Sequence, residues 1–212
     1  MPQGLITALV ELKRDEVLAA VQSGINKGDS PIQILDECRQ GMAIVGDRFQ
    51  KGDYFLAELM LSADLFKKAT AILEPHLAGA RLAAPVGKVV LATLRGDIHD
   101  LGKNIVATLL QAQGFEVHDL GVDVPPSVAV ERIREIRPEF VGFSALITTA
   151  FASMKEASEM LQKEGLRDSL RLMIGGGVTT PLVKDYVGAD FQTIDAMEGV
   201  DYCMNVVGSR RR

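Results

Sequence analysis

The chain of 212 residues is poor in cysteine and has no long apolar run. Its two cysteines, Cys38 and Cys203, form no CxxC motif, so neither a disulfide framework nor a thiolate zinc site is expected. The longest stretch without a charge, Phe140 to Met154, has 15 residues, fewer than the roughly 20 that span a bilayer. The N-terminus lacks the basic and apolar regions of a secretory signal. These absences predict a cytoplasmic protein with no membrane partner.

Basic residues are also too few for a nucleic-acid partner to be expected. The chain has 28 acidic and 23 basic residues, a net charge of -5, whereas nucleic-acid binding needs a basic face. Hydrophobic residues make up 47% of the chain, which is enough to build a core without disulfides or structural metals. The composition therefore predicts a globular protein of one or two domains.

Apolar residues recur at helical spacing through the first 80 or so residues. A break at Gly24–Asp29 divides this region, and Ser30 and Pro31 are typical of a helix start. The pattern predicts four helices: near Leu5–Leu12, near Val17–Val21, from Pro31 to Phe49, and from Tyr54 to Leu73, before Pro75. Short connections favour a four-helix bundle. A Pro- and Gly-containing linker, Leu77–Gly87, then separates a helical domain, 1–84, from a second domain, 85–212.

Short β-branched runs alternate with helical stretches in the second domain. This alternation predicts a flavodoxin- or Rossmann-like α/β fold with a five-stranded parallel sheet and helices on both faces. The expected strands are Lys88–Leu94, Glu116–Leu120, Phe140–Ser144, Arg171–Ile174 and Asp190–Thr193. The expected helices are Lys103–Gln113, Ser127–Ile136, Thr149–Glu164, Pro181–Val187 and Glu198–Val207.

Three clusters of unusual residues each follow a predicted strand. They are Gly96–Asn104 after the first strand, Ser144–Thr149 after the third and Gly175–Thr180 after the fourth. In the strand order 2-1-3-4-5 these three strands are neighbours, and ligands of open α/β sheets bind at the carboxyl ends of the strands. The three clusters are therefore expected to form one site.

His99 is the residue of the first cluster with the clearest chemistry. Asp97 stands two residues before it, and a carboxylate that accepts one ring N–H orients a ligating imidazole and raises its basicity. One histidine cannot hold zinc by itself, and the other two, His76 and His118, stand in unrelated positions. A metal bound by His99 must therefore bring most of its ligands with it, as part of a cofactor. The Gly175–Gly177 triplet would let backbone approach something slender and flat.

Other interpretations of each cluster remain open when the clusters are taken singly. A loop histidine beside an aspartate is often a capping or turn feature, and three glycines can form a strand-to-helix turn. Gly96–Lys103 resembles a P-loop, but five residues rather than four separate its glycines, and Asn104 replaces the Mg²⁺-binding Ser/Thr. No GxGxxG follows the first strand. His99-Asp100 also resembles a metal phosphohydrolase dyad, although the further histidines of such sites are missing.

Taken together, the clusters resemble the cobalamin-binding signature DxHxxG, SxL, GG. The chain has Asp97-x-His99-x-x-Gly102, then 41 residues, Ser144-x-Leu146, then 28 residues, and Gly175-Gly176. The helical half is similar to the cap module of the same family over Gly41–Leu56. The resemblance covers nearly the whole chain and is to the standalone corrinoid proteins of methyltransferase systems, related to the cobalamin module of methionine synthase.

The resemblance implies a role for each matching residue. His99 would be the lower axial cobalt ligand in place of the cofactor's own dimethylbenzimidazole base (base-off, His-on), and Asp97 would accept its other N–H. Phe49, Leu56 and Met60 would cover the upper face of the corrin, although ordinary bundle core is the alternative for them. The remaining residues implied to bind the cofactor are Gly96, Ile98, Asp100, Gly102, Ser144, Leu146, Thr148, Gly175, Gly176, Gly177 and Ala196.

Two positions depart from the family pattern. Ala150 stands where methionine synthase continues the Asp–His pair to a serine, so the proton relay is expected to end at water, Thr148 or Thr149. Ala57 stands where many relatives carry proline at the start of the fourth helix. Neither departure touches His99.

The family resemblance also implies a function, that of a methyl carrier rather than a complete enzyme. Cob(I)alamin would accept a methyl group from a substrate-specific corrinoid methyltransferase, and methylcobalamin would pass it to a second methyltransferase that delivers it to tetrahydrofolate or a thiol such as coenzyme M. A reductive activase would restore the cofactor. The alternatives are a cobalamin-dependent sensor and the cobalamin subunit of an adenosylcobalamin mutase. The sequence leaves open whether the donor is methanol, a methylamine, a betaine or an aryl ether.

Overall fold

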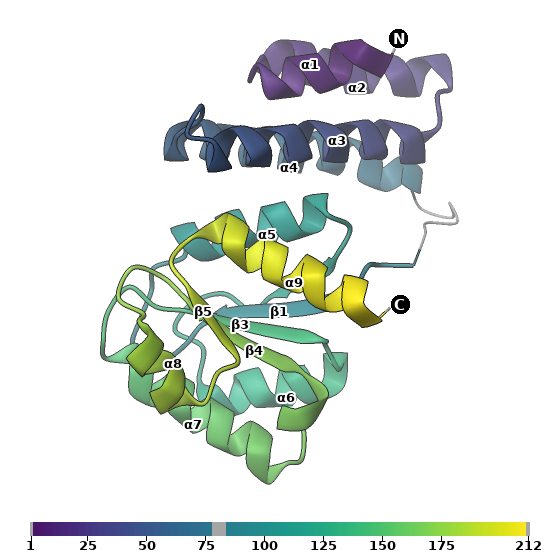
Figure 1. Cartoon of the computed structure of the whole chain (residues 1–212). Coiled ribbons are helices and arrows are strands. Elements are labelled where there is room, and N and C mark those ends of the chain that lie inside the picture. The colour runs from purple at the N-terminus through teal and green to yellow at the C-terminus, as the bar shows by residue number, and fades with distance from the viewer. Residues whose placement is uncertain (1, 78–83, 211–212) are drawn as a thin grey trace. The chain divides into compact units, whose positions relative to one another are not determined.

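A computed structural model describes residues 2–77 and 84–210 (Figure 1). The chain forms two compact units. The first comprises the chain up to Ala84 together with Ala112–Gly114, and the second comprises Pro85–Gln111 and Phe115–Arg212. Residues 78–83, in the middle of the predicted linker, lie outside the described part of the chain. Among the described residues, no helix combines the length and the apolar character needed to span a membrane.

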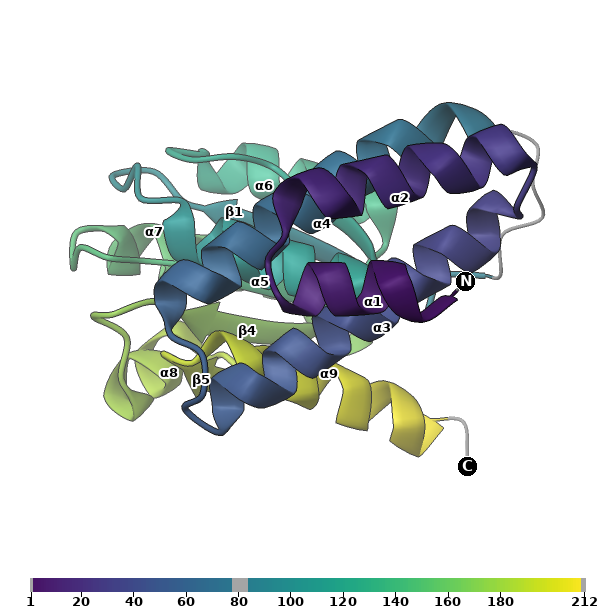
Figure 2. The same cartoon turned by 90° about the horizontal axis from the view of Figure 1, so that it is seen from above.

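The first unit consists of the helices α1 (Pro2–Val10), α2 (Arg14–Lys27), α3 (Pro31–Gln50) and α4 (Leu56–Leu77). The helices α1 and α2 form one layer of the bundle, and α3 and α4 form the other (Figures 1 and 2). Each helix buries the apolar stripe that predicted it, with side chains that include Leu9, Val17, Val21, Cys38, Val45, Leu65 and Leu73. The predicted four-helix bundle is confirmed.

Two of its helices are longer than predicted. The helix α2 continues through Gly24 and ends where Gly28 adopts a left-handed conformation (φ 81°) that caps it. The helix α4 continues through Pro75, which the sequence predicted to stop it. Proline removes one backbone hydrogen-bond donor, but its fixed φ is compatible with a helix. So close to the end of α4, the free energy lost with that hydrogen bond is small compared with what the burial of Leu73 contributes.

The second unit is a five-stranded parallel sheet in the order β2-β1-β3-β4-β5. Its strands are β1 (Lys88–Thr93), β2 (Glu116–Asp119), β3 (Phe140–Ser144), β4 (Arg171–Gly175) and β5 (Phe191–Thr193). Its helices are α5 (Leu101–Ala112), α6 (Pro126–Ile136), α7 (Ala150–Lys163), α8 (Pro181–Val187) and α9 (Ala196–Arg210), with a 3₁₀ turn at Arg167–Ser169. The helices α5 and α9 cover one face of the sheet, and α6, α7 and α8 cover the other (Figure 1). The predicted fold class and strand order are confirmed.

Strand register brings the predicted clusters to one edge. Thr93 pairs with Ser144, and Ser144 pairs with Gly175, at the carboxyl ends of β1, β3 and β4. These three strands are buried almost throughout, because helices cover both faces. The loops that leave their ends therefore start side by side on a rigid frame.

The helices α5 and α9 begin two residues earlier than predicted. Asp195 caps α9, since its Oδ1 accepts the N–H of Met197 at 2.7 Å, and this capping places Ala196 at the first helical position. Leu101 begins α5, so Gly102 lies inside the helix rather than in the loop before it. Both shifts bring helix N-termini to the carboxyl edge of the sheet.

Candidate functional site

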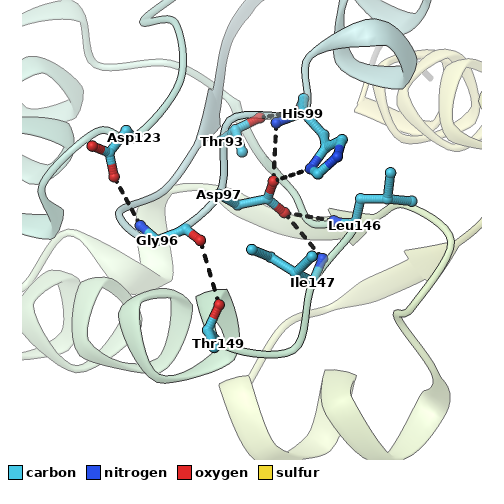
Figure 3. A network of polar contacts seen from close by, with 8 residues as sticks. All are labelled: Thr93, Gly96, Asp97, His99, Asp123, Leu146, Ile147 and Thr149. Atoms are coloured by element: carbon cyan, nitrogen blue, oxygen red, sulfur yellow. Dashed lines mark hydrogen bonds and ion pairs between the residues drawn. The ribbon is translucent and has the colours of Figure 1, made fainter.

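The loop between β1 and α5 places a buried carboxylate at the centre of the site (Figure 3). Asp97 Oδ1 accepts the backbone N–H of His99 at 2.9 Å and lies 2.7 Å from the His99 ring Nδ1. Its Oδ2 accepts the backbone N–H groups of Leu146 at 2.6 Å and Ile147 at 3.2 Å. The DxH and SxL segments are thus joined through one carboxylate.

These donors keep Asp97 ionised. Burial, the largest single influence, raises its pKa, but the hydrogen bonds from the backbone of Leu146 and His99, the His99 ring and the backbone of Ile147 together outweigh it. The net result is a pKa below the ordinary value, because each of these donors is bonded to the charged form. Asp97 is therefore an acceptor only.

The orientation of the His99 ring follows from that charge. An ionised Asp97 can only accept, so Nδ1 carries the proton and the lone pair of Nε2 is free. The His99 side chain is 49% exposed, whereas Asp97 is fully covered. Thr93, at the end of β1, donates its hydroxyl to the His99 carbonyl at 3.0 Å and fixes the backbone as well. The arrangement presents one imidazole nitrogen to a metal from outside the fold.

The expected proton relay to Thr148 or Thr149 is not formed by the described residues. Thr149 Oγ1 donates to the carbonyl of Gly96 at 3.4 Å, and Asp97 receives backbone N–H groups at the oxygen that faces away from His99. Ala150 is buried at the first position of α7. A methyl group therefore stands at the position where the family resemblance would place the serine hydroxyl of a relay. Backbone N–H groups thus take the place of the two threonine hydroxyls at Asp97, and a relay that ends at water stays a prediction.

A cavity of about 120 Å³ opens among β1, β3, β4 and the N-terminal parts of α5 and α9. Five residues implied by the resemblance line it: Gly102, Ser144, Gly175, Gly176 and Ala196. The sequence did not single out its other walls, which include Leu91, Lys103, Val106, Phe143, Met173, Phe191 and Asp195. Because these walls are largely apolar or glycine, the cavity suits a flat organic group of low polarity.

The glycines of the GG segment are required by the backbone. Gly176 has φ 105°, and a Cβ there would lie 2.1 Å from the carbonyl oxygen of Ala145. A Cβ on Gly175 would lie 3.1 Å from the carbonyl oxygen of Thr193. A Cβ on Gly177 would lie 3.2 Å from Leu146 Cδ1, although Gly177 does not line the cavity. A side chain is therefore excluded at Gly176 and would be tightly crowded at Gly175 and Gly177.

Most of the other implied residues lie on exposed surface. Around His99, the side chains of Ile98 and Leu146 are 71% and 46% exposed, and Asp100 and Thr148 are exposed too. In the helical unit, Leu56 and Met60 are exposed one turn apart on α4, and Phe49 is half-buried at the end of α3. Phe55, 72% exposed, is an apolar residue beside them that the sequence did not single out. Ala57, the second residue of α4, stands in a regular helix without the expected proline.

The described residues contain no group of three or more His, Cys, Asp or Glu side chains that could hold a metal ion. Asp123, which the sequence also did not single out, contacts through its carboxylate the loop between β1 and α5 that carries His99 (residues 94–100, the ligand loop; Figure 3). It follows β2 in a turn, and a turn aspartate carries no periodic signal that would have drawn attention to it.

Comparisons with known proteins agree with this geometry. The sequence matches the B12 binding domain over residues 87–205, and residues 2–74 match a second B12 binding domain. The fold and site are thus those of a B12-binding protein. A dimethylamine corrinoid protein of Methanosarcina barkeri is 39% identical over 200 residues, which cover 93% of each chain.

Two solved structures are similar over nearly all of this chain. A cobalamin-binding protein from Desulfitobacterium hafniense DCB-2 is 36% identical, with a TM-score of 0.72 and coverage of 97% of this chain and 98% of that one. The methanol:cobalamin methyltransferase complex MtaBC from Methanosarcina barkeri contains a chain with 28% identity and a TM-score of 0.85, covering 97% of this chain and 78% of that one. The chain described here belongs to the corrinoid proteins of methyltransferase systems.

Proposed function

We propose that this protein carries a methyl group between two methyltransferases on a corrinoid whose lower cobalt ligand is His99. One observation supports the proposal above all. The buried, ionised Asp97 holds Nδ1–H of His99 and leaves Nε2 free on a half-exposed ring. A lone imidazole so prepared suits a metal that arrives inside a macrocycle with its equatorial ligands in place.

The site's residues fit a corrinoid in two further respects. The cavity beside the ligand loop would take the displaced dimethylbenzimidazole base, because Gly175 and Gly176 put no side chains into it and most of its other walls are apolar. Ile98 and Leu146 offer exposed apolar surface next to His99. Gly96, Asp100, Gly102, Ser144, Thr148, Gly177 and Ala196 complete the proposed cofactor site.

When bound, the corrinoid supplies the cobalt that takes up and releases the methyl group. The protein's own contribution is to position a ligand and a proton. Asp97 stays charged and accepts the hydrogen bond of His99 Nδ1–H, so the Nδ1 proton is held and Nε2 is the ring nitrogen that faces outward. Backbone N–H groups occupy the other oxygen of Asp97 and fix the carboxylate that orients the ring.

We further propose that residues 1–84 act as a cap and residues 85–212 as the cofactor-binding domain. Phe49, Leu56 and Met60 would cover the methyl-bearing face, since all three offer apolar surface at the junction of α3 and α4. A fragment 85–212 should retain cobalamin, because His99, Asp97 and the cavity all lie within it. A fragment that folds but no longer binds would contradict this division of labour.

The partners of such a carrier would be a substrate-specific methyltransferase, a second methyltransferase that delivers to tetrahydrofolate or a thiol such as coenzyme M, and a reductive activase, all acting in the cytoplasm. Dimethylamine is the first donor to test, because dimethylamine corrinoid proteins are among the relatives, and methanol is the second.

The test is an EPR spectrum of the Co(II) form, with nitrogen-15-labelled protein and unlabelled cobalamin. A nitrogen-15 doublet on the cobalt lines is expected for a protein nitrogen, and it should disappear in His99→Ala. His118→Ala is the control, since His118 lies on β2 and pairs with Glu116. A nitrogen-14 triplet in the wild-type protein would mean that the cofactor keeps its own base. The axial-ligand proposal would then be wrong.

A further inference from the structure

The loop that carries His99 is held from the side of β2 by a second aspartate. Asp123 Oδ1 accepts the backbone N–H of Gly96 at 2.8 Å (Figure 3). The backbone N–H of Asp123 in turn donates to the carbonyl of Asp97 at 3.0 Å. The two hydrogen bonds are reciprocal, and they fix both ends of the Gly96–Asp97 segment.

The backbone of Asp123 is itself held in an unusual conformation. Its φ of 52° lies in the left-handed region, which costs most residues about 1–2 kcal/mol and which Asp and Asn adopt more readily. Backbone hydrogen bonds between β1 and the turn after β2 impose this conformation. The N–H of Thr93 donates to the Gly121 carbonyl at 3.0 Å, and the N–H of Val124 donates to the Thr93 carbonyl at 3.1 Å. Strain of this kind persists only where the surroundings determine it, and it is concentrated at functional sites.

We propose that Asp123 is a positioning residue for the cobalt ligand. Its carboxylate holds the Gly96–Asp97 segment, while the N–H groups of Leu146 and Ile147 hold the carboxylate of Asp97. Asp97 is therefore fixed at both backbone and side chain, and His99 takes its orientation from Asp97. The inference rests on the proposed role of His99.

If Asp123 served only to stabilise the fold, the effect of removing it would not be confined to the ligand loop. The side chain of Asp123 is exposed and its carboxylate contacts Gly96, so its removal leaves the buried core of the sheet unchanged. The effect should therefore appear in the orientation of His99 rather than in the stability of the fold. This difference makes the two roles separable.

Two substitutions at this position separate its two properties, and a third, elsewhere in the chain, is the control. Asp123→Asn keeps an oxygen acceptor and tolerates the left-handed backbone. Asp123→Gly keeps the backbone freedom and removes the acceptor. Arg137→Gly is the matched control, because Arg137 has a similar φ of 51° at the end of α6, away from the ligand loop.

Two measurements are made on each protein: affinity for aquacobalamin, and the nitrogen-15 chemical shifts of the His99 ring without cofactor. Asp123→Gly should bind roughly tenfold more weakly, the lower end of what loss of a ligand-orienting contact costs, and its ring shifts should move towards those of a free imidazole. Asp123→Asn and Arg137→Gly should match the wild type in both measurements.

Wild-type affinity and wild-type ring shifts in Asp123→Gly would overturn the proposal, even with the EPR doublet of His99 intact. Should Asp123→Gly fail to fold, hydrogen exchange at the Gly96 amide of the wild-type protein decides. Strong protection is expected, and exchange as fast as in an open loop would refute the contact. Absence of the doublet in the wild-type protein would instead remove the proposed function on which this inference rests.

Discussion

Asp97 Oδ1 lies 2.7 Å from His99 Nδ1. The other oxygen, Oδ2, is hydrogen-bonded only to backbone N–H groups among the described residues. A backbone N–H group can only donate a hydrogen bond. A serine hydroxyl can both donate and accept one, and can therefore pass a proton on. Within the part of the chain that the structure describes, the pair is therefore an anchored orienting contact that continues to no further side chain.

Replacing Asp97 by Asn should impair both ligand positioning and the fold. The amide NH₂ group must face either the N–H groups of His99 or those of Leu146 and Ile147, so donors meet donors. We expect cobalamin affinity to fall about 10–100-fold. The free energy of unfolding of the apoprotein should fall by about 1–3 kcal/mol. Equilibrium dialysis and urea titration measure the two effects, and unchanged affinity would show that Asp97 does not orient His99.

Gly176→Ala should destabilise the sheet unit more than an ordinary turn substitution. The new Cβ would lie 2.1 Å from the Ala145 carbonyl oxygen, at φ 105°. We expect a loss of about 3 kcal/mol or more in the free energy of unfolding, from overpacking added to backbone strain. Gly165→Ala is the control, because Gly165 has φ 69° with open space around it, and it should lose only about 1 kcal/mol. Equal losses in the two variants would mean that the clash is relieved.

Gly199→Leu should discriminate between corrinoids with and without a nucleotide tail. Gly199 lines the cavity from α9, so a leucine there would occupy the space proposed for the displaced base. Affinity for cobalamin should fall at least tenfold, the loss expected when the tail is excluded. Affinity for cobinamide, which has no tail, should be unchanged. Gly208→Leu, on the same helix where a new Cβ meets open space, controls for helix effects. Equal weakening of both ligands would argue against the cavity as the tail site.

The two thiols should make the fold less stable in alkaline solution. Burial raises the pKa of Cys38 and of Cys203 from 9.0 to about 12. Between pH 9 and 12 the thiols ionise only in the unfolded chain, so the free energy of unfolding falls as pH rises, by about 1.4 kcal/mol per pH unit for each thiol. Below pH 9 they contribute no slope.

Urea titrations at pH 8, 9 and 10 measure this slope, and a Cys38→Ala/Cys203→Ala double variant removes it. Other groups also titrate in this range, so the difference between the two proteins is the decisive quantity. A thiol reagent at pH 8 should modify neither cysteine until the protein is unfolded. Rapid modification of the native protein would contradict the burial of both thiols.

The fold was largely predictable because its determinants are periodic. Alternation of strands and helices indicated a parallel sheet, and the segments Phe140–Ser144 and Pro181–Val187 have the bounds that the sequence predicted. Helix ends were less predictable. Pro75 remains inside α4, and Asp195 begins α9 through a capping contact that periodicity does not reveal.

The site was predictable only where spacing carries information. The DxHxxG, SxL and GG segments could be aligned, and strand register brings them to one edge. Contacts that depend on the third dimension could not be foreseen. The sequence offered the hydroxyls of Thr148 and Thr149, beside water, as ends of a proton relay, but the backbone N–H groups of Leu146 and Ile147 contact Asp97 instead of those hydroxyls.

Pairing of Thr93 with Ser144, and of Ser144 with Gly175, has a consequence for the order of assembly. The three segments stand far apart in the chain and come together only when the central strands have aligned. A partly folded chain would therefore offer a corrinoid no site, and uptake of the cofactor would select molecules with the sheet complete. The bound cofactor would then favour that state by mass action, so protein loaded in the cell should resist proteolysis that degrades the empty form.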